Sequence, residues 1–154
     1  MAEHGEAIST LNTLIATTID SVTGYEDSAK NIHDDRLRDI FRDRADERQR
    51  VVEELRGEVR RLGGDPEDGG SFLGKAHQRF EDLKAAITGR DEKAIINEVE
   101  RGEDYLKEKW QAALQSGNLD GETHDLVERC YQSVKQGHDQ ISQFKHAFEG
   151  QANS

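Results

Sequence analysis

The sequence has few of several residue types, and each shortage excludes a class of protein. Among its 154 residues there is one cysteine, one tryptophan and one proline. A single cysteine cannot build an intrachain disulfide framework. The one proline, Pro66, leaves long stretches of chain free to be helical. No apolar run approaches the roughly 20 residues that cross a bilayer, so we expect no membrane-spanning segment.

Basic residues are also in short supply. Lys and Arg number 21 against 32 Asp and Glu, which gives a formal net charge of −11. A protein that binds nucleic acid or an anionic membrane surface needs a clustered basic face, so we expect neither partner. The first ten residues, MAEHGEAIST, resemble no signal peptide. These features predict a cytoplasmic protein.

Apolar residues recur every three or four positions over four long stretches, as on the buried side of amphipathic helices. The stretches cover residues 8–32, 37–62, 94–114 and 127–148. Three aspartates stand where N-caps are expected, namely Asp34, Asp91 and Asp120. Gly63 and Gly117 follow the second and third stretches, as helix-ending glycines do. The pattern predicts four long helices.

A flexible segment, GGDPEDGGS at residues 63–71, separates the second helix from the third. Apolar residues between Phe72 and Ile87 then predict a shorter helix that returns the chain to its starting end. We therefore expect an all-α, ferritin-like antiparallel four-helix bundle, with a short extra helix in the long crossover between the second and third helices. The chain should form one domain, 1–154, with frayed ends at about 1–5 and 150–154.

One residue breaks the apolar pattern of the third helix. Its buried stripe includes Val99, Leu106 and Trp110, and the position missing between them is Glu103. A buried carboxylate is costly unless it is paired with a cation, a metal ion or hydrogen-bond donors. The partner of Glu103 is therefore the central question about this chain.

Three runs of the sequence, RRLGGDPEDGGS, DLKAAITGRD and VERGEDYLKEKW, resemble the DUF2383 family of bacterial four-helix-bundle proteins. The resemblance extends over about residues 9–148. It implies a ferritin-like fold and no established activity.

Ferritin-like di-iron sites use a Glu from each of two helices and a Glu-x-x-His pair from each of the other two. The second helix offers Glu47 with Arg50 in place of the His, and the fourth offers His138 with Lys135 in place of the Glu. The first helix has no carboxylate at the matching level. Since cations at ligand positions repel a metal ion, we expect a polar core layer of Arg44, Arg48, Arg50, Glu103 and Lys135 instead.

Other residues near this level have plainer interpretations. Gly137 occupies a core position of the fourth helix, and His138 lies beside it at the edge of the buried face. Tyr25 and Tyr131 are expected to be core aromatics with their hydroxyls at the polar layer. Cys130 is expected to be an inert apolar residue.

Two functions are compatible with these observations. The preferred one is a non-enzymatic, stress-associated structural or interaction protein, without cofactor or catalytic residues, that binds an unknown protein partner or itself. The alternative is a metal-binding protein with iron or oxygen chemistry, or another divalent metal, at Glu47, Glu103 and His138, with Glu100 and Glu54 as further ligands. The glycine-rich segment is acidic and lacks the lysine of a phosphate-binding loop, which argues against nucleotide binding.

Overall fold

The computed structural model describes residues 4–67 and 92–152, which form four α-helices and no strand. The helices are α1 (Gly5–Asn31), α2 (Asp35–Arg61), α4 (Glu92–Gln115) and α5 (Gly121–Ala152). The predicted all-α four-helix bundle is confirmed. The short helix expected in the crossover, and the N-cap expected at Asp91, fall outside the described residues. α5 continues through Ala152, into the segment at about 150–154 that the sequence predicts to be frayed.

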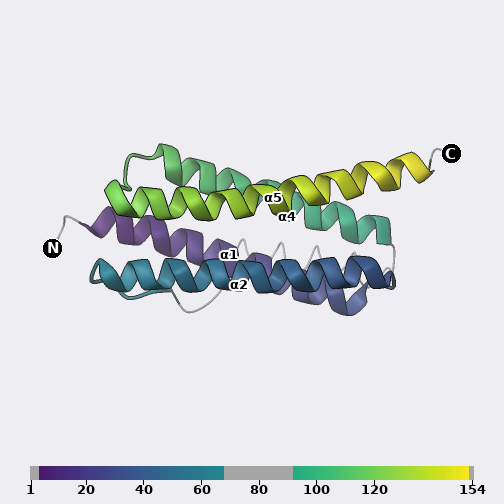
Figure 1. Cartoon of the computed structure of the whole chain (residues 1–154), viewed down its shortest axis with the longest axis horizontal. Helices are drawn as coiled ribbons and strands as arrows, with labels where there is room; N and C mark the ends of the chain where they lie inside the picture. The colour runs from purple at the N-terminus through teal and green to yellow at the C-terminus, as the bar shows by residue number, and fades with distance from the viewer. Residues whose placement is uncertain (1–3, 68–91, 153–154) are drawn as a thin grey trace.

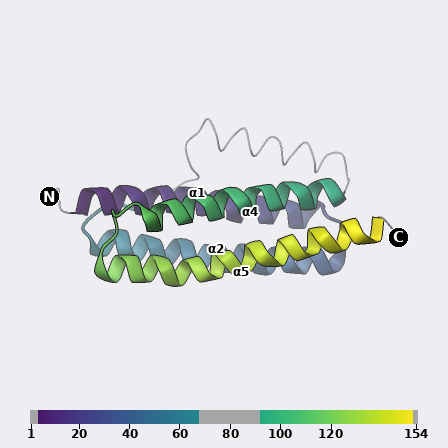
Figure 2. The same cartoon turned by 90° about the horizontal axis from the view of Figure 1, so that it is seen from above.

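The helices lie in two antiparallel pairs, α1 with α2 and α4 with α5 (Figure 1). The same bundle seen from above places α1 beside α4 and α2 beside α5 (Figure 2). Each helix therefore has two antiparallel neighbours. The C-terminal end of α5 extends past the ends of the other three helices in both views.

Local signals set the helix ends as the sequence predicts. The side chain of Asp34 accepts a hydrogen bond from the backbone N–H of Leu37 at 3.0 Å and so caps α2. Gly63 follows α2 with a φ of 88°, and Gly117 follows α4 with a φ of 78°. Such left-handed backbone is easily adopted only by glycine. Asp34 and Gly117 thus lie in the short connections within the two helix pairs, and Gly63 lies where the crossover from α2 begins.

The buried apolar side chains form two clusters, one toward each end of the bundle. The first surrounds Trp110 and includes Leu11, Leu55 and Val127. The second surrounds Phe41 and includes Ile95, Ile141 and the ring of Tyr25. Between them, buried charged residues of α2 and α4 interrupt the core. This polar interruption is the candidate site.

Two polar side chains hold the ends of the crossover against the α1–α2 hairpin. Asn12 of α1 donates to the backbone oxygen of Asp65 at 3.1 Å and accepts from the N–H of Glu67 at 2.9 Å. At the opposite end of the bundle, Glu92 of α4 accepts from the N–H groups of His33 and Asp34, both at 3.0 Å. The chain thus leaves one end of the bundle and begins α4 at the other.

Candidate functional site

Arg48 of α2 and Glu103 of α4 form a buried ion pair in the middle of the bundle. The two terminal nitrogens of Arg48 bind the two oxygens of Glu103, with Nη1–Oε1 at 2.8 Å and Nη2–Oε2 at 2.9 Å. The side chains are 0% and 1% exposed. Two parallel bonds between a guanidinium and a carboxylate make the strongest common ion-pair geometry. Glu103 therefore has its partner, and that partner is Arg48.

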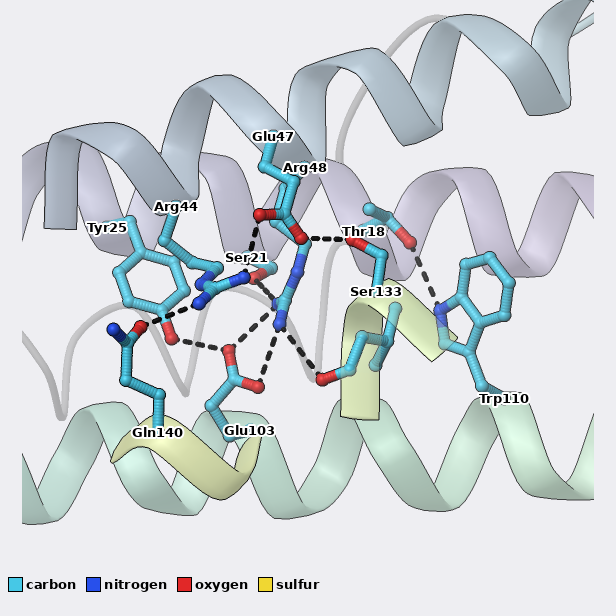
Figure 3. Close-up of polar contacts among 11 residues, drawn as sticks. Thr18, Ser21, Tyr25, Arg44, Glu47, Arg48, Glu103, Trp110, Ser133 and Gln140 are labelled. Carbon is cyan, nitrogen blue, oxygen red and sulfur yellow. Dashed lines mark hydrogen bonds and ion pairs between the residues drawn. The ribbon is translucent and has the colours of Figure 1, made fainter. Parts of the chain in front are cut away.

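The same guanidinium also binds the other two helices (Figure 3). Nη1 donates to the hydroxyl of Ser21 on α1 at 2.8 Å. Nη2 donates a longer bond, 3.4 Å, to the backbone oxygen of Val134 on α5. Arg48 thus contacts all three other helices through one rigid planar group. This geometry fixes the level at which the four helices meet.

Tyr25 of α1 completes the environment of the pair. Its hydroxyl donates to Oε1 of Glu103 at 2.5 Å, and its ring lies 5.8 Å from the guanidinium carbon of Arg48. The ring also packs against Phe41, with centroids 5.7 Å apart. Burial raises the pKa of Tyr25 well above its usual value, and the negative charge of Glu103 raises it further. The phenol is therefore a permanent hydrogen-bond donor to Glu103.

The charge of Arg48 is secured by its partner. Burial alone would lower the pKa of Arg48, but Glu103, Tyr25 and Glu47 together more than offset this, so the net shift of the pKa is upward. A guanidinium whose already high pKa rises further stays protonated. Arg48 therefore keeps its positive charge in the pair.

A second arginine, Arg44, lies one helical turn away on the same face of α2. It donates to Oε2 of Glu47 at 2.8 Å and to the side-chain oxygen of Gln140 on α5 at 2.6 Å. Glu47 in turn accepts a hydrogen bond from the hydroxyl of Ser133 on α5. The layer therefore contains two guanidiniums and two carboxylates, so its formal charges cancel.

Gly137 of α5 provides the space that these arginines occupy. A Cβ atom added at residue 137 would collide with Nη2 of Arg48 and would lie 3.0 Å from Nε of Arg44. The Nε atoms of both arginines are buried and have no hydrogen-bond partner among the described residues, so their positions depend on this close packing. Glycine in a core position of α5 is explained by the volume of the guanidiniums opposite.

A tryptophan borders the layer on the side of the first apolar cluster. Trp110 is fully buried, and its indole N–H donates to the hydroxyl of Thr18 at 3.3 Å (Figure 3). The Thr18 hydroxyl donates in turn to the backbone oxygen of Leu14 at 2.6 Å. The indole nitrogen of Trp110 is therefore hydrogen-bonded where the polar layer meets the apolar core.

Two residues expected in the layer are not part of it. Arg50 and Lys135 are both exposed. Successive residues are turned by about 100° around a helix, so Arg50, two positions after Arg48, faces away from the core. Lys135 follows the buried Val134 by one position and is turned outward in the same way. Tyr131 also differs from expectation, because its hydroxyl accepts from Gln111 at 3.0 Å, away from the layer.

The alternative metal ligands are engaged in separate contacts. His138 lies at the bundle edge, with Nε2 2.6 Å from a carboxylate oxygen of Asp104. Glu54 accepts from the thiol of Cys130, and Glu100 accepts from Lys145 at 2.8 Å. Across residues 4–67 and 92–152, no group of three or more His, Cys, Asp or Glu side chains is arranged to hold a metal ion. The structure does not bring Glu47, Glu103 and His138 together as one ligand set.

Three contributors to the layer are absent from the sequence-based prediction, namely Ser21, Ser133 and Gln140. Ser133 and Gln140 lie four positions before and three positions after Gly137, so they share its helix face. A glycine in a core position with polar residues one turn away on each side is the pattern that could have identified them. Ser21 has no comparable signal.

The chain matches one family model, described as "Domain of unknown function (DUF2383)", over residues 6–116. The match includes α1, α2 and α4, and so includes Ser21, Tyr25, Arg48 and Glu103; it ends before α5. No curated protein matches the chain. Within the described part of the chain, no helix has the length and apolar character needed to cross a membrane.

Proposed function

Since the chain belongs to the DUF2383 family, whose function is unknown, we propose a role from the geometry of the layer: a non-enzymatic structural and interaction protein. In this proposal Arg48 and Glu103 hold four helices at a defined level, in place of a metal centre. Association with stress and a cytoplasmic location stay predictions from the sequence.

The observation that carries the proposal is the position of the Arg48 guanidinium. It lies within hydrogen-bond distance of both oxygens of Glu103, where a metal ion bound by Glu103 would have to lie. A divalent cation at that distance from a guanidinium would meet a like charge in a low-dielectric interior. The residues of the layer therefore do not fit a metal centre of the ferritin-like kind.

The hydrogen bonding of the remaining polar groups supports the same conclusion. Oε1 of Glu103 accepts from Tyr25 as well as from Arg48. Glu47, the second carboxylate of the layer, accepts from Arg44 and Ser133. Each carboxylate of the layer therefore already has its donors and its balancing charge without any ligand.

Metal analysis of the purified protein tests the proposal directly. The chain should be prepared without chelator and without a histidine tag, and its iron, manganese and zinc should be measured by mass spectrometry. We expect less than stoichiometric metal, and a urea unfolding midpoint that is unchanged by a chelator. The matched control is Glu103→Gln, which removes the charge of the only fully buried carboxylate of the layer.

Stoichiometric metal in the wild-type protein that is lost in the Glu103→Gln variant would contradict the proposal and favour the metal-binding alternative. Metal that persists in the variant would belong to another part of the chain. In that case the layer itself would still be metal-free, and the structural role proposed for Arg48 and Glu103 would stand.

A further inference from the structure

The first helix of the bundle is uncharged around most of its circumference. Between residues 7 and 25 of α1 the only charged side chain is Asp20. α2, by contrast, carries exposed charges on the side turned away from the core, at Asp39, Asp46 and Glu53. A helix without a charged face is typical of a helix that is buried on every side. α1 therefore lacks the charged outward face that α2 presents to solvent.

The outward side of α1 is buried in the middle of the helix. Ala16 lies two positions before Thr18 and is turned about 200° around the helix from it. Thr18 points inward, since its hydroxyl accepts from the indole N–H of Trp110 in the core. Ala16 is nevertheless only 4% exposed, whereas Arg50, two positions after the buried Arg48 of α2, is exposed. The core of the bundle therefore does not account for the burial of Ala16.

This burial extends over residues 10–25 of α1, the covered stretch, in which no residue is exposed. Ser9 and Glu26, just beyond its two ends, are exposed. Within the covered stretch, Thr13 and Thr17 donate their hydroxyls to backbone oxygens one turn earlier in α1, at 3.1 and 2.8 Å. Both hydroxyls thus have acceptors within their own helix and need no water. The covered stretch is suited to an apolar contact.

None of the other three helices lies on the outward side of α1. Its neighbours are α2 and α4, and α5 lies diagonally across the bundle (Figures 1 and 2). Beyond the described residues the chain has three parts, 1–3, 68–91 and 153–154. Three residues span at most about 11 Å, and Ala16 lies about 17 Å along the helix from Gly5. Both ends are therefore too short to cover the middle of α1, which leaves residues 68–91.

Both attachment points of residues 68–91 lie next to α1. Asn12 of α1 binds the backbone of Asp65 and Glu67. Glu92 binds the N–H groups of residues 33 and 34, just past the end of α1. The rise along α1 between these two levels is about 30 Å. The connecting chain must therefore travel nearly the whole length of α1.

The sequence between these points carries an apolar stripe of matching length. Its members recur at helical spacing, namely Phe72, Ala76, Phe80, Leu83 and Ile87. Residues 72–87 number 16, as do residues 10–25 of the covered stretch. An amphipathic stripe needs an apolar surface to pack against, and the uncharged side of α1 provides one.

We propose that the outward side of α1, residues 10–25, is the docking surface for the crossover of the same chain, residues 68–91, through the stripe from Phe72 to Ile87. The occupant is this segment rather than a second copy or another protein, because its two attachment points lie at the two ends of the surface. The proposal goes beyond the role of Arg48 and Glu103 and does not depend on it.

Thiol labelling of the full-length chain tests whether the surface is covered. Ala16→Cys is made in a Cys130→Ser background, with Gln136→Cys, at an exposed position of α5, as the control. We expect a maleimide to modify Ala16→Cys at least about tenfold more slowly than Gln136→Cys in the folded protein, because the reaction requires local opening. The ratio of rates should be the same at protein concentrations about a hundredfold apart, since the covering segment belongs to the same molecule.

Substitutions in the crossover test which segment covers the surface. Phe80→Ser with Leu83→Ser removes two apolar members of the stripe and should raise the labelling rate of Ala16→Cys to that of Gln136→Cys. Gln78→Ser, two positions from Ala76 and from Phe80, is the matched control and should leave the rate unchanged. Far-UV circular dichroism and the fluorescence of Trp110 show whether each variant keeps the bundle.

Three results of the labelling would overturn the proposal. Labelling of Ala16→Cys as fast as Gln136→Cys, with the crossover unaltered, would mean that the surface is open. Protection that increases with protein concentration would assign the surface to a second copy. Protection unaffected by the two serine substitutions would mean that the stripe is not what covers it.

A stability cycle provides a second test that needs no labelling. Ala16→Glu places a carboxylate beneath the stripe and should lower the midpoint of urea unfolding. In the chain with Phe80→Ser and Leu83→Ser the stripe no longer covers residue 16, so Ala16→Glu should lower the midpoint much less. Equal effects of Ala16→Glu in the two chains would contradict docking of the crossover on α1.

Discussion

Arg48 and Glu103 lie 55 positions apart in the chain and face each other through two hydrogen bonds of 2.8 and 2.9 Å, with neither side chain more than 1% exposed. Removing either partner leaves a charge in the core, whereas removing both leaves none. Replacing one partner and replacing both must therefore have different effects on the free energy of unfolding.

A double-mutant cycle measures this difference. Glu103→Leu and Arg48→Met should each reduce the free energy of unfolding by about 3–5 kcal/mol, because each strands one buried charge. The double variant should recover much of the combined loss. Urea denaturation is the measurement, and Arg50→Met, at an exposed position, should change stability by no more than about 0.5 kcal/mol. Additive losses in the cycle would show that the pair is not coupled.

Substitution by alanine should change the stability of the protein in opposite directions at two glycines of the bundle. Gly137→Ala places a methyl group against Arg48 and Arg44 and should destabilise the protein by about 1–3 kcal/mol through overpacking. Gly102→Ala is the matched control, since its Cβ would meet nothing within 4 Å. That change should stabilise the protein by about 0.5–1 kcal/mol, because alanine favours a helix. Thermal or urea unfolding measures both changes. An unchanged stability in Gly137→Ala would contradict the close packing of Arg48 against residue 137.

Tyr25 should make the stability of the protein sensitive to alkaline pH. Burial and the charge of Glu103 raise the pKa of Tyr25 in the folded state above its usual value of 10.0. The unfolded chain therefore releases this proton first, so the contribution of Tyr25 is complete below about pH 10 and is lost as the pH rises further. Tyr25→Phe should flatten the dependence above pH 10, and it should cost about 1.5–3 kcal/mol at pH 7 through the lost hydrogen bond to a carboxylate. An unchanged alkaline slope in Tyr25→Phe would place the titrating group elsewhere.

Glu58 should contribute to stability at neutral pH and lose that contribution in acid. Hydrogen bonds from Arg61, together with one from Thr123, hold the pKa of Glu58 below its usual value of 4.5. Stability from this group is complete above the unfolded pKa and falls as the pH falls through the folded pKa. Since Arg61 is half exposed, Glu58→Gln should cost only about 1 kcal/mol at pH 7. Unfolding curves between about pH 3 and pH 7 test this, with Glu53→Gln, an exposed carboxylate of the same helix, as the control.

Cys130 should be unreactive in the folded protein. Burial raises the pKa of its thiol to about 12, and the hydrogen bond to Glu54 contributes to the rise. Since the thiolate is the reacting form, a thiol reagent at pH 8 should modify Cys130 at least about tenfold more slowly than it modifies the chain unfolded in urea. Gln136→Cys in a Cys130→Ser background gives an exposed control on the same helix. Equal rates in folded and unfolded wild-type protein would show that packing of α5 in the bundle does not protect the thiol.

The sequence allowed the level of the polar layer to be predicted, because Glu103 interrupts an otherwise regular apolar stripe. It did not allow a choice between Arg44 and Arg48, which lie four positions apart and share one face of α2. Which of them reaches Glu103 depends on the spacing and level of α2 and α4, a tertiary property. Arg50 could have been excluded, since it lies about 200° around the helix from Arg48.

Gly137 illustrates a different limit. Its periodicity marks a vacant core position in the fourth helix, and the sequence alone suggests a gap beside His138. The space is instead filled from α2 by Arg48 and Arg44. Gly137 and Arg48 lie 89 positions apart in the chain. The sequence pattern of neither helix contains the fit between them, so only the packed structure reveals it.

The contacts of Asn12 and Glu92 have a consequence for protein engineering. They fix the chain at residues 65–67 and at residue 92. Both ends of the intervening segment are therefore held by side chains that do not belong to that segment. The contacts that fix both attachment points therefore come from Asn12 and Glu92, so a change confined to the residues between 67 and 92 leaves these hydrogen-bonding groups in place.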